Sequence, residues 1–191
     1  MREPGTTILS VPSAERMEEV GRQIGAAIDA AADGPFILAL EGDLGAGKTT
    51  LVRGILRAFG ITGAIRSPTY TLIEPYETAR RPLYHLDLYR LVDPAEVEPL
   101  GLRDLLTGRQ GGGTAEGMSD ASVGLLPAVL LIEWPSRAAG VIPAADVWVD
   151  FVYPSQGTEG RELRLTPHSP SGHNAMRHIV AAIPELRHLS S

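Results

Sequence analysis

The chain has 191 residues with a formal net charge of −6, an isoelectric point near 5.4, and 43% hydrophobic and 21% charged residues. These values are typical of a globular protein with its own hydrophobic core, and we expect residues 1–191 to form a single domain. The lack of cysteine excludes a disulfide framework and a thiolate zinc site. The acidic charge balance argues against a broad basic surface that binds nucleic acid unaided. Neither a secretory signal nor an apolar run of about 20 residues is present, so we expect a cytoplasmic protein without a membrane span.

The first predicted elements are a short edge strand at Ile8-Leu9 and an amphipathic helix capped by Ser13. Glu15 lies in the first turn of this helix, where the helix dipole favours a negative charge. Apolar residues then recur at helical spacing until Gly34-Pro35: Met17, Val20, Ile24, Ile28 and Ala31. We interpret this helix as a packing element.

The next segment carries a phosphate-binding pattern. Residues 36–40 are an apolar run typical of a strand that is buried on both faces. Residues 42–49, GDLGAGKT, match the pattern G-x-x-x-x-G-K-[ST]. Leu51 and Ile55 then recur at helical spacing, and Gly60 is a typical helix end. Strand, glycine loop and helix N-terminus follow in the order that lets backbone N–H groups and the helix dipole bind phosphate.

The lysine content of the chain favours the same interpretation. Of the 17 basic residues, 16 are Arg, and Lys48 is the single lysine. Its ammonium is a compact point charge suited to the β and γ phosphates, whereas Arg is a bulky planar fork that does not replace it there. The hydroxyl of Thr49 would face Mg²⁺. The alternative is a glycine-rich turn with an incidental lysine.

Residues 67–71, SPTYT, follow the predicted helix. Pro68 disfavours a helical conformation at Ser67, so this segment is expected to be extended. Its hydroxyl side chains, including Thr69, are typical of a switch that senses the γ-phosphate. The start of a plain strand explains the same residues equally well.

Two predicted strands, 70–76 and 83–89, flank a turn-forming segment, which indicates a β-hairpin and therefore a mixed sheet. Side chains alternate between the two faces of a strand, so His85, Asp87 and Tyr89 are expected on one face. An acid there would orient an attacking water or hold Mg²⁺ through a water. A hydrogen-bonded polar cluster on a partly exposed face is the alternative.

A glycine-rich segment follows a predicted helix start at Asp93-Pro94 and a short helical piece over 100–106. Residues 107–124 include three consecutive glycines and have no hydrophobic periodicity, so we interpret them as a flexible surface insertion. A second phosphate-binding loop is the alternative, although no lysine follows these glycines and no strand precedes them.

Residues 128–133, AVLLIE, form an apolar run that ends in an acid. In P-loop proteins a buried strand delivers a carboxylate at its C-terminal edge, beside the metal that the loop hydroxyl holds. Glu133 is therefore a predicted Mg²⁺ ligand, and Trp134-Pro135 would end the strand and wall the site. The alternative is a core strand with an exposed terminal Glu.

The last predicted elements are antiparallel strands over 146–153 and 161–166, a helix over 174–183, and a frayed tail from residue 184. Histidines scattered over this region lack carboxylate or thiolate neighbours, so we interpret them as surface residues: His168, His173, His178 and His188. The elements together predict an α/β protein with a P-loop NTPase-like central sheet, mixed between parallel and antiparallel strands and flanked by helices.

Four motifs resemble those of the bacterial TsaE family in order and approximate spacing: GDLGAGKTT at 42–50, SPTYT at 67–71, HLDLYR at 85–90 and IEWP at 132–135. The similarity extends from about Ile8 to Leu165. It implies a small P-loop ATPase of the pathway that makes threonylcarbamoyladenosine beside the tRNA anticodon. The resemblance also implies work with the transferase TsaD and its companion TsaB, contact with tRNA only through that complex, and ATP hydrolysis that resets the assembly.

The resemblance further implies roles for individual residues, with ATP and Mg²⁺ as cofactors. Thr49 and Glu133 would bind Mg²⁺, and Asp87, Lys48 and Thr69 would serve hydrolysis. The nucleotide contacts would come from Asp43, Leu44, Gly45, Ala46, Gly47, Lys48, Thr49, Thr50 and Trp134. Two features differ from the family pattern, because Met17 stands where the family often has Thr and the segment 107–124 is longer than the usual link.

Two other functions fit the same nucleotide site. A small-molecule or nucleotide kinase would need an acceptor pocket and a mobile basic lid, and the best lid candidate, 107–124, carries only Arg109. A nucleotide-gated switch with little turnover would keep the site and bind a partner when loaded. A GTP-specific switch is disfavoured because the chain has no Asn-Lys pair to read guanine.

Overall fold

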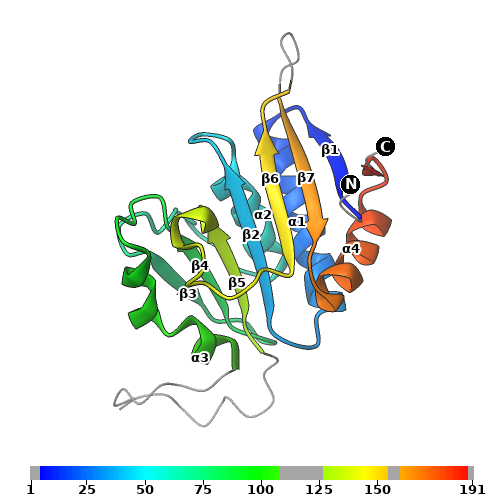
Figure 1. The fold of residues 1–191 in the computed structure, drawn as a ribbon. Helices are drawn as coiled ribbons and strands as arrows, with labels where there is room; N and C mark the ends of the chain where they lie inside the picture. Colours follow the sequence, from blue (N-terminus) through cyan, green and yellow to red (C-terminus); the bar gives the residue numbers. More distant parts are fainter. Residues whose placement is uncertain (1–4, 108–126, 155–159, 189–191) are drawn as a thin grey trace.

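The computed structural model describes residues 5–107, 127–154 and 160–188 (Figure 1). Within them, eight strands form one sheet: β1 (Thr7–Val11), β2 (Phe36–Gly42), β3 (Ile73–Tyr76), β4 (Leu83–Asp87), β5 (Val129–Glu133), β6 (Val147–Val152), β7 (Arg161–Pro167) and β8 (Arg187–His188). The α-helices are α1 (Ala14–Ala31), α2 (Lys48–Ala58), α3 (Leu102–Thr107) and α4 (Pro170–Ala182), and the 3₁₀ helices are η1 (Pro94–Leu100) and η3 (Pro135–Ala138). Apart from Thr107, the predicted insertion at 107–124 lies outside the described residues. In this part of the chain no helix is long and apolar enough to cross a membrane.

The sheet is mixed, as the sequence predicts. Its strands run in the order β3-β4-β5-β2-β6-β7-β1-β8, and the four neighbours β4, β5, β2 and β6 are parallel. The pairs β3–β4, β6–β7, β7–β1 and β1–β8 are antiparallel, which confirms the predicted hairpin. The C-terminal ends of the four parallel strands therefore meet at one edge, where open α/β sheets bind their ligands.

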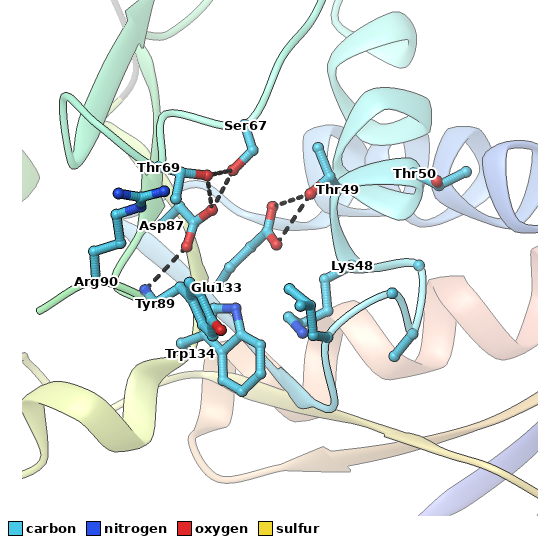
Figure 2. Close-up of a pocket in the computed structure, with 14 residues that line it drawn as sticks. Lys48, Thr49, Thr50, Ser67, Thr69, Asp87, Tyr89, Arg90, Glu133 and Trp134 are labelled. Carbon is cyan, nitrogen blue, oxygen red and sulfur yellow. Dashed lines mark hydrogen bonds between the residues drawn. The ribbon is translucent and has the colours of Figure 1, made fainter.

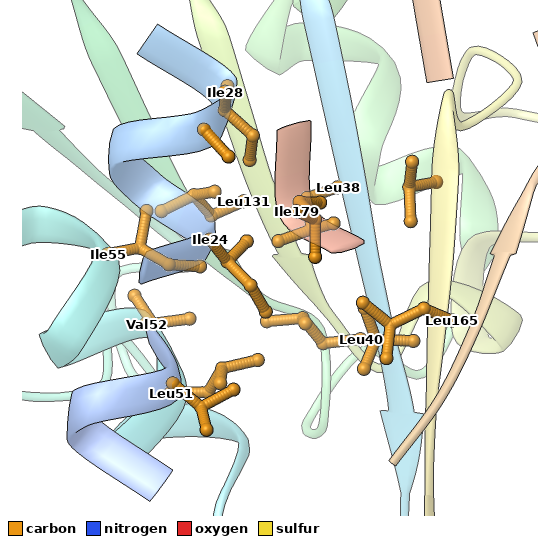
Figure 3. Packing of buried hydrophobic residues seen from close by; sticks show 14 of the residues in the cluster. Ile24, Ile28, Leu38, Leu40, Leu51, Val52, Ile55, Leu131, Leu165 and Ile179 are labelled. Carbon is orange, nitrogen blue, oxygen red and sulfur yellow. The ribbon is translucent and has the colours of Figure 1, made fainter. Parts of the chain in front are cut away.

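Helices cover both faces of the sheet. Helices α1, α2 and α4 pack on one face, where Leu38 and Leu40 of β2 join the larger hydrophobic cluster (Figure 3). Ile37 of the same strand joins a second cluster on the other face, with Leu130 of β5 and residues of η1 and α3. Because β2 is buried on both faces, its apolar run lacks an alternating polar pattern.

Helices α1 and α2 approach each other so closely that their contact requires glycine. A Cβ atom at Gly21 would lie 2.3 Å from the carbonyl oxygen of Leu51, and one at Gly54 would lie 2.1 Å from that of Glu18. Both distances are shorter than atoms tolerate, so the two backbones are in direct contact. Since α2 begins at Lys48, this contact also fixes the direction in which the glycine loop points.

The two strands of the predicted hairpin are shorter than expected. Residues 70–72 form a turn instead of the start of β3: Leu72 has a φ of 63°, and its N–H donates to the carbonyl oxygen of Pro68 at 2.8 Å. Strand β4 ends at Asp87, whose Oδ1 accepts a hydrogen bond from the Tyr89 N–H at 3.0 Å and turns the chain. The expectation that Tyr89 continues the strand is therefore wrong.

The C-terminal region is more ordered than the sequence indicates. Helix α4 begins at Pro170 rather than residue 174, because the Ser169 hydroxyl caps it by accepting from the Gly172 N–H at 2.9 Å. The predicted frayed tail is wrong for residues 184–188. Leu186 is buried in the larger cluster, and β8 pairs with β1.

We predict that Gly54→Ala lowers the free energy of unfolding by about 1–3 kcal/mol, the usual cost of overpacking. This loss should exceed the gain of up to about 1 kcal/mol in helix propensity, because the new methyl group would overlap the Glu18 carbonyl oxygen. Gly34→Ala is the matched control, since no atom lies within 4 Å of its added Cβ. Urea unfolding followed by circular dichroism measures both variants, and equal stabilities would contradict the prediction.

Candidate functional site

A cavity of about 480 Å³ lies at the C-terminal edge of the parallel strands, beside the loop that joins β2 to α2 (Figure 2). It is lined by Leu44, Gly45, Ala46, Gly47, Lys48, Thr49, Thr50, Ser67, Thr69, Asp87, Tyr89, Arg90, Glu133 and Trp134. The structure therefore brings together predicted residues from four separate segments. Asp43 does not line the cavity, although its backbone carbonyl contacts the Lys48 side chain.

The loop between β2 and α2 depends on glycine at its two ends. Gly42 has a φ of 148°, and a Cβ there would lie 2.7 Å from the Cβ of Phe151. Gly47 has a φ of 106° and directly precedes α2, whose first N–H groups have no intrahelical acceptor. Met17 of α1 packs beneath this loop, because a Cβ at Gly47 would lie 3.3 Å from its methyl group. Met17 is a buried core residue here.

The Lys48 side chain lies against the loop and an aromatic ring. Its Nζ donates to the carbonyl oxygens of Gly42 and Asp43, at 2.6 Å and 2.9 Å, and lies 3.7 Å from the ring centroid of Trp134. Burial lowers the pKa of Lys48, while the negative charges of nearby acids, Glu133 first among them, partly oppose that shift. Neutral carbonyls and a π-face are weaker partners for an ammonium than phosphate oxygens are.

Thr49 and Glu133 meet because β2 and β5 are paired in register. Leu40 of β2 is opposite Glu133, the last residue of β5. The Thr49 hydroxyl donates to Glu133, with its Oγ1 2.9 Å from Oε1 and 3.1 Å from Oε2 (Figure 2). Glu133 is only 2% exposed, so the alternative of an exposed terminal Glu is wrong. A hydroxyl and a carboxylate are hard oxygen donors that fit Mg²⁺, an ion commonly held by one or two carboxylates together with phosphates.

Asp87 lies beside this pair, since β4 places it opposite Glu133 in the parallel register. Its Oδ2 accepts hydrogen bonds from the hydroxyls of Ser67 and Thr69, and the Thr69 contact is 2.8 Å long (Figure 2). With the Tyr89 N–H on Oδ1, three donors reach a carboxylate that has about four acceptor positions. The loop at 67–71 thus holds Asp87 by its hydroxyls.

Trp134 forms one wall of the cavity. It has a φ of 59°, an unusual backbone conformation for a residue other than glycine, and Pro135 follows it at the start of η3. Its ring lies 5.0 Å from that of Tyr89 at an angle of 46° (Figure 2). The Trp134 ring therefore contacts both the Lys48 ammonium and the Tyr89 ring.

Three lining residues were not predicted as site residues: Ser67, Tyr89 and Arg90. Ser67 stands two positions before Thr69, and residues two apart in an extended segment point to the same side. The position of the Ser67 side chain beside Thr69 could therefore have been inferred from the sequence. Tyr89 and Arg90 follow the end of β4 in a turn, so the strand alternation that was expected to place Tyr89 beside Asp87 does not apply to either residue. Arg90 stacks over Tyr70 at 4.2 Å beside the loop at 67–71.

The fold and this site define a P-loop NTPase-like α/β protein. The model of the family described as "Threonylcarbamoyl adenosine biosynthesis protein TsaE" matches residues 11–163. The tRNA threonylcarbamoyladenosine biosynthesis protein TsaE of Haemophilus influenzae is 39% identical over 135 residues, which are 71% of this chain and 72% of that protein. The protein of the same name from Bacillus subtilis is 35% identical over 130 residues, 68% of each chain. The chain belongs to the TsaE family, which acts in tRNA threonylcarbamoyladenosine biosynthesis.

A solved structure has the same fold. The crystal structure of YdiB from Bacillus subtilis superposes with a TM-score of 0.64 and covers 93% of this chain and 95% of its own. Its sequence is 23% identical, so this likeness concerns the fold.

If the loop at 42–49 binds nucleotide phosphates, as its pattern predicts, the lowered pKa of Lys48 predicts that this binding weakens at alkaline pH. Burial makes the free ammonium lose its proton below the ordinary lysine pKa of about 10.4. At a pH between the lowered and the ordinary pKa of Lys48, binding of ATP would require the side chain to take up a proton. The affinity for ATP should therefore fall with rising pH by up to about tenfold per pH unit. Calorimetry in buffers of different ionisation enthalpy measures both affinity and proton uptake. Constant affinity up to about pH 10 without proton uptake would contradict the prediction.

Proposed function

We propose that this protein is a Mg²⁺-dependent ATPase that supports tRNA threonylcarbamoyladenosine modification. The observation that carries the proposal is the hydrogen bond between the Thr49 hydroxyl and the Glu133 carboxylate. In P-loop NTPases, the loop hydroxyl and a strand-end acid are the protein groups that hold the metal. The pairing of these two groups beside a glycine loop supports metal-assisted phosphoryl chemistry.

The proposed mechanism assigns each side chain a task at a bound ATP. The N–H groups at the start of α2 and the Lys48 ammonium would bind the phosphates, with Lys48 exchanging two carbonyls for phosphate oxygens. Thr49 and Glu133 would hold Mg²⁺, which would supply positive charge to neutralise the negative charge that develops on the phosphates. Asp87 would orient the attacking water through its one remaining acceptor position, and Trp134 would exclude bulk water.

We further propose TsaD and TsaB as the partners, with ATP hydrolysis resetting their assembly between rounds. The net charge of −6 supports contact with tRNA through these partners rather than directly. A cytoplasmic location follows from this role, because the substrate tRNA is found there.

The partner proposal is tested by measuring ADP release from the purified chain with and without the TsaD–TsaB pair. Slow release alone and faster release with the pair is the expected result. Tight ATP binding without any stimulation would instead favour a nucleotide-gated switch or a kinase, and a screen of nucleoside and small-molecule acceptors would separate those two.

The metal and phosphate assignments predict that Lys48→Ala, Thr49→Ala and Glu133→Ala each abolish ATP turnover. The cause is the loss of a phosphate-binding charge in the first variant and of a metal ligand in the other two. Phosphate release measures turnover, and circular dichroism verifies that each variant is folded. Full activity of Glu133→Ala would remove the metal assignment.

The contacts of Asp87 predict that Asp87→Asn lowers kcat by about 10²–10⁴-fold while ATP affinity stays nearly unchanged, because the carboxylate acts on the water and not on the nucleotide. Thr69→Val should lower kcat in the same direction, since it removes one of the hydroxyls that orient Asp87. Thr71→Val is the matched control, because Thr71 is exposed and does not line the cavity. A fall in ATP affinity without a fall in kcat would contradict these roles.

A further inference from the structure

His85 is a fully buried polar residue that lies behind the cavity and does not line it. Its Nε2 is 2.8 Å from Oε1 of Glu133. An ionised carboxylate can only accept hydrogen bonds, so the ring must carry a proton on Nε2 and donate it to Glu133. Among the described residues, Nδ1 has no hydrogen-bond partner. In this part of the chain, the ring therefore makes its polar contact with Glu133 alone.

The contact adds a second donor to Oε1, the Glu133 oxygen that lies nearer to the Thr49 hydroxyl. Oε1 accepts from the Thr49 hydroxyl at 2.9 Å and from His85 Nε2 at 2.8 Å, whereas Oε2 has the Thr49 hydroxyl at 3.1 Å. His85 approaches from β4, the strand that pairs with β5, while Thr49 approaches from α2. The carboxylate is thus held from two elements.

We propose that His85 is a positioning residue for the metal site, which holds the Glu133 carboxylate toward Thr49 by donating from Nε2. The proposal rests on the proposed function, because it needs Glu133 to be a Mg²⁺ ligand. Carboxylates that bind metals are commonly hydrogen-bonded by a second layer of residues, and loss of such a partner lowers metal affinity by about 10–100-fold. Without His85, the buried Oε1 loses a donor, and the carboxylate is free to leave the orientation that the metal requires.

The test is Mn²⁺ binding to protein loaded with a non-hydrolysable ATP analogue, measured from the free Mn²⁺ signal in electron paramagnetic resonance. His85→Leu fills the buried position with an apolar side chain and removes the Nε2–H donor. We expect its Mn²⁺ affinity to fall by about 10–100-fold. Affinity for the analogue without metal should stay at the wild-type value. High Mg²⁺ should restore the ATPase rate of this variant, because the defect lies in metal binding.

Two amide variants separate positioning from simple core packing. His85→Gln can place an N–H donor near the position of Nε2, whereas the shorter His85→Asn cannot reach it. Gln is therefore expected to retain Mn²⁺ affinity at least about tenfold better than Asn. This comparison stays decisive if His85→Leu does not fold, and equal losses in the Gln and Asn variants would overturn the proposal.

Leu83→Ala is the matched control for a weakened β4. Leu83 is a buried residue two positions before His85 on the same strand, and it does not line the cavity. The Leu83→Ala variant should have a lower melting temperature but an unchanged Mn²⁺ affinity. An equal loss of Mn²⁺ affinity in Leu83→Ala and His85→Leu would overturn the proposal, because destabilisation of the strand would then explain both.

Glu133→Ala separates failure of this proposal from failure of the proposed function. If Glu133→Ala binds Mn²⁺ as the wild type does, Glu133 is not a metal ligand, and the proposed role of His85 is contradicted as well. If Glu133→Ala loses Mn²⁺ affinity and His85→Leu keeps it, the metal site stands and only the role of His85 is overturned.

Discussion

The parallel register of β4, β5 and β2 is the constraint on which the site depends. It sets Glu133 opposite Leu40, two residues before the glycine loop begins, and Asp87 opposite Glu133. Side chains alternate between the faces of a strand, so a slip of one residue would turn Glu133 away from Thr49. The hydrophobic runs of these strands prevent such a slip, because it would also move core side chains between the two clusters that helices cover on either face.

The same geometry concentrates charge in a place that water hardly reaches. Glu133, Asp87 and Lys48 are each at least 96% buried, and each has hydrogen-bond partners fixed by the fold. Buried charges are tolerated when they are paired and hydrogen-bonded. In so dry a site, oriented dipoles and charges act more strongly on a developing negative charge than they would in water, and they need little rearrangement during reaction. Folding thus builds in advance the arrangement that phosphoryl transfer would use.

Much of this arrangement could be predicted from local patterns. The strand β2, the glycine loop and α2 are consecutive in the chain, and the acid that ends β5 follows an uninterrupted apolar run. Features that depend on contacts between distant segments could not be predicted. The pairing of β8 with β1 joins the two ends of the chain, and the His85–Glu133 hydrogen bond depends on strand register. The turn at Leu72 depends on a positive φ, and no glycine in the sequence indicates it. The start of α4 is different, because Ser169-Pro170 is a capping signal in the sequence itself, whereas the apolar periodicity of this helix begins only later.

The central claim is that Thr49 and Glu133 form one metal site with the phosphates of ATP. It is tested most directly by a crystal structure with Mn²⁺ and a non-hydrolysable ATP analogue, in which anomalous scattering locates the metal. The account predicts an anomalous peak within coordination distance of the Thr49 hydroxyl oxygen, close to the ~2.0–2.1 Å typical of Mg²⁺, with Glu133 bound to the metal directly or through a water. It also predicts that Lys48 Nζ has left the carbonyls of Gly42 and Asp43 for the phosphates. A metal away from Thr49 and Glu133, or a Lys48 side chain still on those carbonyls with the analogue bound, would contradict it.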